Sequence, residues 1–480
     1  MTIEIFGAVA ILLGIYCTLN GPDWTFQVFL VCTLLQATAA ISLPALGGAN
    51  IQPGHVLLGF VILAVVTRPQ YAKGIGNIIE PGREGFWLLL TVVYGVVSAY
   101  FMPRLFAGQT LVFTVDRNSP VPLASPLGPV SGNITQTVYF VGSAMCFLAT
   151  YAFASGSGAA LTVLIRAGVA CAMLNLFFGA ADLVTYWTGT SYIMDVLRTA
   201  QYSMLNETTI AGFKRIVGSF SEAGAYAFFT LGLLGFSLRL WLGGVMVRAT
   251  GPISLLSILA LTMSTSTTAY AGLPLYLVAA FGLSLLRFLR GPVPPRTIIF
   301  LFLSPIILCV IVIPLILNDT VWAVIQQVAR ITVFEKMTSD SGVERGNWNR
   351  QAITNFIETF GFGAGLGSIR SSSFLAAVPS NLGVFGTLTY TIFLVQILLK
   401  KKVGEEGSLS YEFRAAAAHG CIGLFIAACL VGGFVDLGLM FFTLAGIAAS
   451  RPAELRSSRT STLDRDQLTV RALRVSRSAS

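Results

Sequence analysis

The chain has 480 residues, of which 55% are hydrophobic and only 11% charged, with a mean hydropathy of +0.78 and a net charge of +9. Soluble domains carry about 25% charged residues, so this chain has too little polar surface to cover a soluble fold. The composition excludes a soluble globular protein and predicts a membrane protein.

Apolar stretches recur along the whole chain, each interrupted by Pro, Gly or charged residues. The stretches are continuous rather than alternating, and a backbone in lipid must satisfy its own hydrogen bonds, so they predict helices and not a closed β-barrel. We expect an all-α polytopic protein with twelve to fourteen spans. The thirteen expected spans are 3–19, 24–46, 51–67, 86–102, 136–154, 159–186, 222–238, 252–268, 272–288, 297–317, 382–399, 415–431 and 434–449.

The 30 Lys and Arg residues predict the orientation of the spans. Assigning 68–85, 239–251, 287–296, 400–414 and the C-terminal tail to the cytoplasm places 19 of these charges there and ten on the other side. Positive charge collects on the cytoplasmic side of membrane proteins. We therefore expect a bacterial inner-membrane protein with its longest loops, 103–135, 187–221 and 318–381, in the periplasm.

The chain divides into a membrane domain, 1–450, and a basic tail, 451–480. The tail holds seven Arg among Ser and Thr with no apolar period, which predicts disorder beside anionic membrane lipid rather than nucleic-acid binding. All seven cysteines fall inside expected spans, and the chain has only two histidines. We expect no metal site and no cofactor.

The longest loop contains an amphipathic helix. Between 343 and 360, Trp348, Ile353, Ile357 and Phe360 recur at helical spacing, which favours a helix along the membrane surface. The helix runs into a segment in which Gly363, Gly365 and Gly367 alternate with other residues. Such glycines can turn backbone N–H groups toward an anion, or simply return the chain to the next span.

A second candidate lies just before a span, where Lys214 and Arg215 precede Glu222. These groups could be interfacial anchors, but the periplasmic side does not favour positive charge, so a functional role is the better interpretation. Glu222 could act as a general base or pair with Arg215. Asp182 and Asp436 are weaker candidates of the same kind.

Five pieces of the chain resemble the O-antigen polymerase and ligase family of GT-C type membrane glycosyltransferases. They are Gly47 to Ile51, Arg215 to Phe220, Ser264 to Thr268, Arg345 to Gly367, and Asn381 to Gly386. The resemblance implies metal-independent transfer of a glycan from undecaprenyl diphosphate to an acceptor hydroxyl, with a chain-length regulator among the candidate partners.

By this resemblance, Arg215 and Arg345 match the family's two functional arginines, while Lys214, Arg350 and Arg370 are further candidates for binding the substrate. Ligases of the family carry a His after the Gly-x-Gly piece, whereas this chain has Ser371 to Phe374 there and no His in the loop. The difference favours a polymerase of O-antigen, capsule or exopolysaccharide over a ligase. A transporter or flippase is the alternative from another class, but we find no internal repeat that would support it.

Overall fold

The computed structural model describes residues 2–43, 49–113, 124–200, 204–205, 207–210, 212–317, 326 and 340–451. Gly47 and Gly48, most of the segment 318–339, and the tail after Arg451 lie outside the described residues. The expectations for those segments therefore stay predictions.

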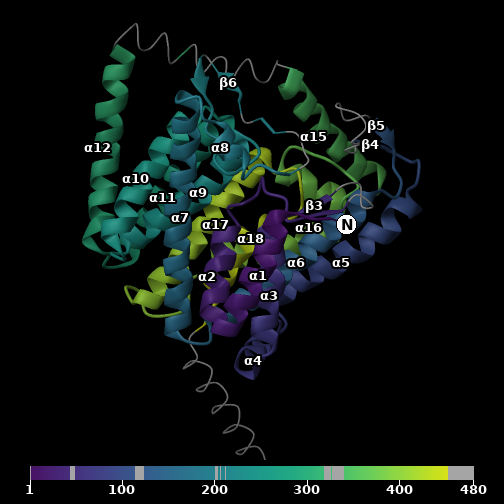
Figure 1. Cartoon of the computed structure of the whole chain (residues 1–480), viewed down its shortest axis with the longest axis horizontal. Coiled ribbons are helices and arrows are strands. Elements are labelled where there is room, and N and C mark those ends of the chain that lie inside the picture. The colour runs from purple at the N-terminus through teal and green to yellow at the C-terminus, as the bar shows by residue number, and fades with distance from the viewer. Residues whose placement is uncertain are drawn as a thin grey trace, which may run out of the picture.

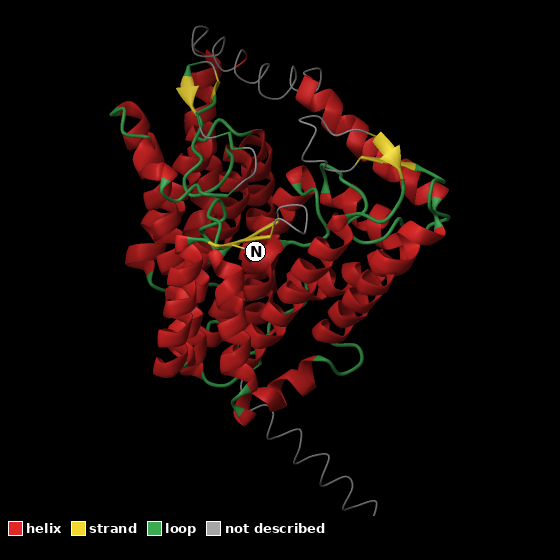
Figure 2. Cartoon of the chain, turned by 45° about the vertical axis from the view of Figure 1, so that its right-hand side comes forward, coloured by secondary structure: helices red, strands yellow, loops and turns green. Residues whose placement is uncertain are grey.

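The described chain is mostly helical, as the apolar stretches predicted (Figures 1 and 2). The helices are α1 (Ile5–Asn20), α2 (Pro22–Cys32), α3 (Pro53–Val66), α4 (Pro69–Ile78), α5 (Glu84–Leu105), α6 (Ser131–Ala154), α7 (Gly158–Trp187), α8 (Tyr192–Asp195), α9 (Ala223–Leu242), α10 (Val247–Met263), α11 (Thr267–Arg290), α12 (Pro295–Leu317), α15 (Asp340–Glu358), α16 (Phe374–Leu398), α17 (Leu409–Val431) and α18 (Gly438–Ala449). The strands are short and pair as β1 (Thr2–Ile3), β2 (Ile41–Leu43) and β3 (Ala49–Ile51), β4 (Leu111–Phe113) with β5 (Ala124–Pro126), and β6 (Thr209–Ile210) with β7 (Phe213–Lys214), all antiparallel.

Seven described helices are long and apolar enough to cross a membrane, or eight if α3 and α4, which are bent by 88° from each other, form one span. The fold is therefore an all-α polytopic membrane protein. Four shorter apolar helices, α1, α10, α12 and α18, also fall in expected spans. The total of twelve to fourteen spans stays a prediction.

The expectation of a continuous span at 24–46 is wrong. Helix α2 ends at Cys32, and the chain then turns into β2, where Ile41 pairs with Ile51. The N–H of Ala37 donates to the carbonyl of Ser219 at 3.2 Å. A distant loop thus accepts the hydrogen bond that, in a continuous helix, would have gone to a carbonyl of the same helix. Hydropathy does not reveal such a partner.

Among the described helices, α9 and α17 form the most extensive pair, and glycines bring their backbones together. A Cβ on Gly235 would lie 2.4 Å from the carbonyl oxygen of His419, and one on Gly423 would lie 2.3 Å from that of Leu231. No side chain fits at such distances. Membrane helices associate without a hydrophobic driving force, and small residues at their crossings let the backbones approach closely enough for extensive van der Waals contact.

The bundle has two distinct ends (Figure 1). One end, here the α15 end, carries α15, α8 and the hairpins β4–β5 and β6–β7, and the other, the α4 end, carries α4. Helix α15 confirms the predicted helix in the long loop. It buries Trp348 and Ala352 and exposes Ile353 and Ile357, so its apolar outer face suits the predicted position along a membrane surface.

Candidate functional site

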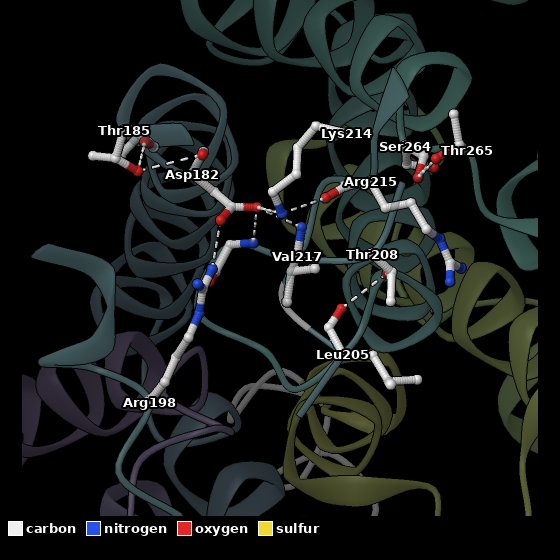
Figure 3. A network of polar contacts seen from close by, with 12 residues as sticks. Asp182, Thr185, Arg198, Leu205, Thr208, Lys214, Arg215, Val217, Ser264 and Thr265 are labelled. Atoms are coloured by element: carbon white, nitrogen blue, oxygen red, sulfur yellow. Dashed lines mark hydrogen bonds and ion pairs between the residues drawn. The ribbon is translucent and has the colours of Figure 1, made fainter. Parts of the chain in front are cut away.

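Arg215 lies in the segment that joins β7 to α9 at the α15 end. Its backbone N–H donates to the carbonyl of Thr208 at 3.3 Å, and its side chain is half-buried. The Nε atom is enclosed and has no hydrogen-bond partner among the described residues. Figure 3 shows the Arg215 side chain extending away from Asp182, whereas the side chains of Lys214 and Arg198 point toward that carboxylate.

Asp182, near the end of α7, holds the Arg215 segment in place. Its carboxylate accepts hydrogen bonds from Arg198 at 2.6 Å and from the N–H groups of Val217 and Gly218 at 2.8 and 3.2 Å. Its side chain is only 3% exposed, as is that of Arg198. Asp182, proposed above as a weak candidate for acid–base chemistry, is thus engaged in binding the neighbouring loop.

Lys214 belongs to this same network and faces away from open solvent. Its ammonium group lies 3.5 Å from Asp182 and donates to the carbonyl of Arg215 at 2.9 Å. Burial lowers the pKa of Lys214, and the charge of Asp182 opposes that shift. The structure therefore places Lys214 in support of the Arg215 backbone; a direct role in binding substrate stays a prediction.

The two arginines that the family resemblance singled out lie within electrostatic range of one another. Burial lowers the pKa of Arg215; the carboxylate of Glu222 opposes this shift, and the charge of Arg345 adds to it. Arg345 comes from α15 and Glu222 is the residue before α9, so positions 130 residues apart in the sequence, 215 and 345, act on one another electrostatically. Tyr270 of α11 also lies within electrostatic range of Arg215.

Arg370 joins the same group from the segment before α16. Burial lowers its pKa, Glu344 and Glu222 oppose the shift, and Arg345 adds to it. The guanidinium group stacks on the ring of Trp348 at 4.3 Å, and the backbone N–H donates to the carbonyl of Phe113 at 3.1 Å. The planar guanidinium is thereby held in one orientation.

We call Arg215, Arg345, Arg370, Glu222 and Glu344 the arginine cluster. It holds three guanidinium groups and two carboxylates, a net charge of +1, at the α15 end of the bundle. Half-buried guanidinium groups that repel one another are predisposed to bind an anion, because the anion relieves both the repulsion and the lost solvation.

Arg350 does not join this cluster. Its side chain is exposed, and among the described residues it forms no ion pair. The structure also gives no group of three or more His, Cys, Asp or Glu residues that could hold a metal ion within the described ranges.

The glycine segment after α15 packs into the bundle. Gly363, Gly365 and Gly367 all have positive φ, and a Cβ on Gly367 would lie 2.3 Å from the carbonyl oxygen of Gly132. The N–H groups of Gly365 and Gly367 donate to the backbone and side chain of Asn381 at 3.1 and 3.0 Å. Of the two interpretations offered above, the structure favours the return of the chain to the next span, because these N–H groups are already occupied.

Asn381 binds the glycine segment from inside α16. Its side-chain oxygen accepts from Gly367 and Ile369, and its amide donates to the carbonyl of Ala377 at 2.9 Å. Helix α16 breaks two residues later at Gly383, which has φ 60°, and begins at Phe374, eight residues before the expected span. The arrangement fixes the segment that carries Arg370.

Sequence reasoning missed three contributors to this site: Tyr270, Glu344 and the stacking of Trp348 on Arg370. Trp348 was identified as an apolar position of the predicted helix and as part of the piece that resembles the family, but not as a partner of Arg370. No local signal identifies these contacts, because each joins segments that are distant in the sequence.

No protein-family model matches the chain, and the search of curated proteins finds no match either. The resemblance to the O-antigen polymerase and ligase family therefore rests on the residues quoted above.

Proposed function

We propose that this protein is a glycosyltransferase that joins glycan repeat units carried on undecaprenyl diphosphate. The observation that supports this proposal most directly is the convergence of Arg215, Arg345 and Arg370 with Glu222 at one end of a membrane bundle. A diphosphate on a membrane-bound lipid carrier would present its charge near the membrane surface. We propose that the half-buried guanidinium groups at this end of the bundle meet it there.

The reaction forms one bond and breaks one. The acceptor hydroxyl oxygen attacks the anomeric carbon of the donor, and the bond from that carbon to the diphosphate oxygen breaks, so the diphosphate leaves with the electron pair. The hydroxyl proton passes to a base, and Glu222 is the carboxylate we assign to that role. Negative charge grows on the leaving diphosphate, and preorganised guanidinium groups stabilise that charge more in the transition state than in the ground state.

Within this class we propose a polymerase of O-antigen, capsule or exopolysaccharide. The segment after the glycines has three serines at 371–373 where ligases carry a histidine, and the ligase is the alternative. The proposed location is the bacterial inner membrane with the arginine cluster facing the periplasm, where a chain-length regulator would be the expected partner. The positive charge of the segments assigned to the cytoplasm supports this orientation.

The deciding experiment is to delete the gene and measure the size of the cell-surface glycan. Single repeat units on the surface support the polymerase, and accumulated lipid-linked polymer supports the ligase instead. An unchanged glycan together with altered solute flux would contradict both and support a transporter. The purified protein should also polymerise lipid-linked repeats in EDTA; loss of activity there, with recovery on adding magnesium or manganese, would contradict the arginine mechanism.

A further inference from the structure

A cavity of about 410 Å³ opens at the α4 end of the bundle, the end opposite the arginine cluster. Its wall is formed by α7, by the turn between α9 and α10, and by the start of α17. Thr162, Arg166, Gly244, Leu409 and Glu412 are among the residues that line it. The cavity therefore lies where α7, the α9–α10 turn and the start of α17 meet.

The carboxylate that lines this cavity is already paired with arginines. Glu412 is buried in the wall, and it is paired with Arg239 of α9 and with Arg287 of α11, the latter at 2.6 Å. The guanidinium group of Arg296 lies beside Gly244, 3.4 Å from the position that a Cβ there would occupy. Glu412 is thus paired with two arginines, while Arg166 lines the same cavity and Arg296 lies beside its wall at Gly244.

Among the described residues neither Arg296 nor Arg166 forms an ion pair, and of these two arginines it is Arg166 that lines the cavity. Arg166 is also exposed. Arg239 and Arg287, by contrast, are committed to Glu412. An arginine on an apolar helix is costly in lipid and is generally found where a ligand, a partner or water compensates it.

Backbone dipoles add to the positive potential. Helix α10 begins beside the cavity, and the residue before it, Met246, adopts a left-handed conformation with φ 47° and gives the helix no side-chain cap. Helix α17, of 23 residues, also begins there, at Leu409. Helix N-termini carry a partial positive charge. Ser408 already caps α17 by accepting from the N–H of Tyr411, so the start of α10, which has no side-chain cap, contributes more to the positive potential in the cavity.

We propose that this cavity binds the phosphate of an anionic phospholipid from the leaflet at the α4 end. The lining includes apolar residues, Ile165, Val245 and Phe413, next to Arg166, and Leu409 is 55% exposed on the outer side. Such a wall suits a molecule with a charged headgroup and an apolar tail. Basic pockets between membrane helices bind phospholipid headgroups in this way, and under the predicted orientation the leaflet is the anionic cytoplasmic one. This site is independent of the proposed glycosyltransferase reaction.

The test uses the purified full chain in neutral detergent and measures binding of phosphatidylglycerol, phosphatidylcholine and inorganic phosphate by native mass spectrometry and by the shift in thermal midpoint. Arg166→Gln should weaken phosphatidylglycerol binding by about tenfold, the effect of losing one hydrogen bond to a charged group. Arg290→Gln is the matched control, because Arg290 is exposed at the end of α11 and does not line the cavity. Its phosphatidylglycerol affinity should match that of the wild type.

Three results would overturn the proposal: equal binding of phosphatidylglycerol and phosphatidylcholine, equal losses in the Arg166 and Arg290 variants, or full displacement of the lipid by millimolar inorganic phosphate. The last result would identify a soluble phosphate compound as the ligand. Because Arg166 is exposed, its variant should keep the thermal midpoint of the wild type in the absence of lipid, which separates lost binding from lost folding.

Discussion

Replacing Asp182 by Asn tests whether this carboxylate positions the segment that carries Arg215. Asn keeps acceptors for the N–H groups of Val217 and Gly218 but removes the charge that faces Arg198 and Lys214. Arg198 would then be buried without its carboxylate partner, and Lys214 would lose the charge of Asp182 and keep the weaker attraction of Glu207. Breaking a buried ion pair by neutralising one partner costs about 3 to 5 kcal/mol, and we expect the lower end because the backbone hydrogen bonds survive.

The loss can be measured on the detergent-purified protein. At an unfolding entropy of about 2.1 cal/mol/K per residue, a loss of about 3 kcal/mol would lower the thermal midpoint of the 480-residue chain by about 3 °C. Amide hydrogen exchange should also become faster in the segment 213–218, which the carboxylate holds. Adding Lys214→Met to Asp182→Asn should recover part of the lost stability, because it removes one of the two buried cations that Asp182 faces in the wild type.

Asp195→Asn is the control for this experiment, because Asp195 is exposed in α8 and forms no ion pair among the described residues. This variant should leave the thermal midpoint and the hydrogen exchange of the segment 213–218 unchanged. An Asp182→Asn protein that melts and exchanges like the wild type, or that gains nothing from the added Lys214 change, would refute the view that this ion network holds the segment.

Three further predictions concern the α15 end and the connection between the last two helices. Arg215→Lys and Arg345→Lys should each reduce glycan transfer roughly a hundredfold, because Lys keeps the charge but loses the bidentate hydrogen bonds of the guanidinium group. Arg104→Lys, at the exposed end of α5, is the control and should retain activity. Normal turnover in the Arg215 or the Arg345 variant would exclude that arginine from the mechanism. Gly367→Val should destabilise the protein by at least about 1 to 3 kcal/mol in denaturant titration, because the left-handed backbone and a carbonyl oxygen 2.3 Å from the added Cβ both oppose it. Burial raises the pKa of Asp436 from 3.8 to about 6. Between about pH 4 and 6 the unfolded chain therefore releases this proton while the folded protein keeps it, so the wild type should lose stability as the pH rises through that range. Asp436→Asn should show a flatter dependence of stability on pH, and identical pH dependence in the two proteins would contradict a buried carboxylate there.

The helices were predictable from the sequence because lipid imposes a simple rule, that an apolar stretch must satisfy its backbone internally. Helix α7, expected at 159–186, spans Gly158–Trp187. The rule fails where another part of the protein replaces the internal hydrogen bonds. The region after Cys32 is the clearest case, since Ser219 and β3 supply the partners there.

The arginine cluster was only partly predictable. Arg215 was identified because positive charge in an outer loop is unfavourable for topology and because its segment resembles a known family, whereas Arg345 was identified through that resemblance alone. Arg370 was a secondary candidate, and the structure places it within electrostatic range of Arg345 and Glu222. Its orientation depends on Trp348 and Phe113, which are 22 and 257 positions away in the sequence, and no pattern within one chain specifies such contacts.

The break at Gly383 bears on how α16 is made in the cell. Hydropathy places the span from 382 onward, whereas the helix begins at Phe374 and its first part contains Ser380 and Asn381. The translocation machinery inserts segments according to their apolarity, so we expect it to insert the part after Gly383 first. The earlier part would reach its final position only when the glycine segment binds Asn381. Biogenesis of this span would then end with a folding step, and the arginine cluster would form only in chains that complete it.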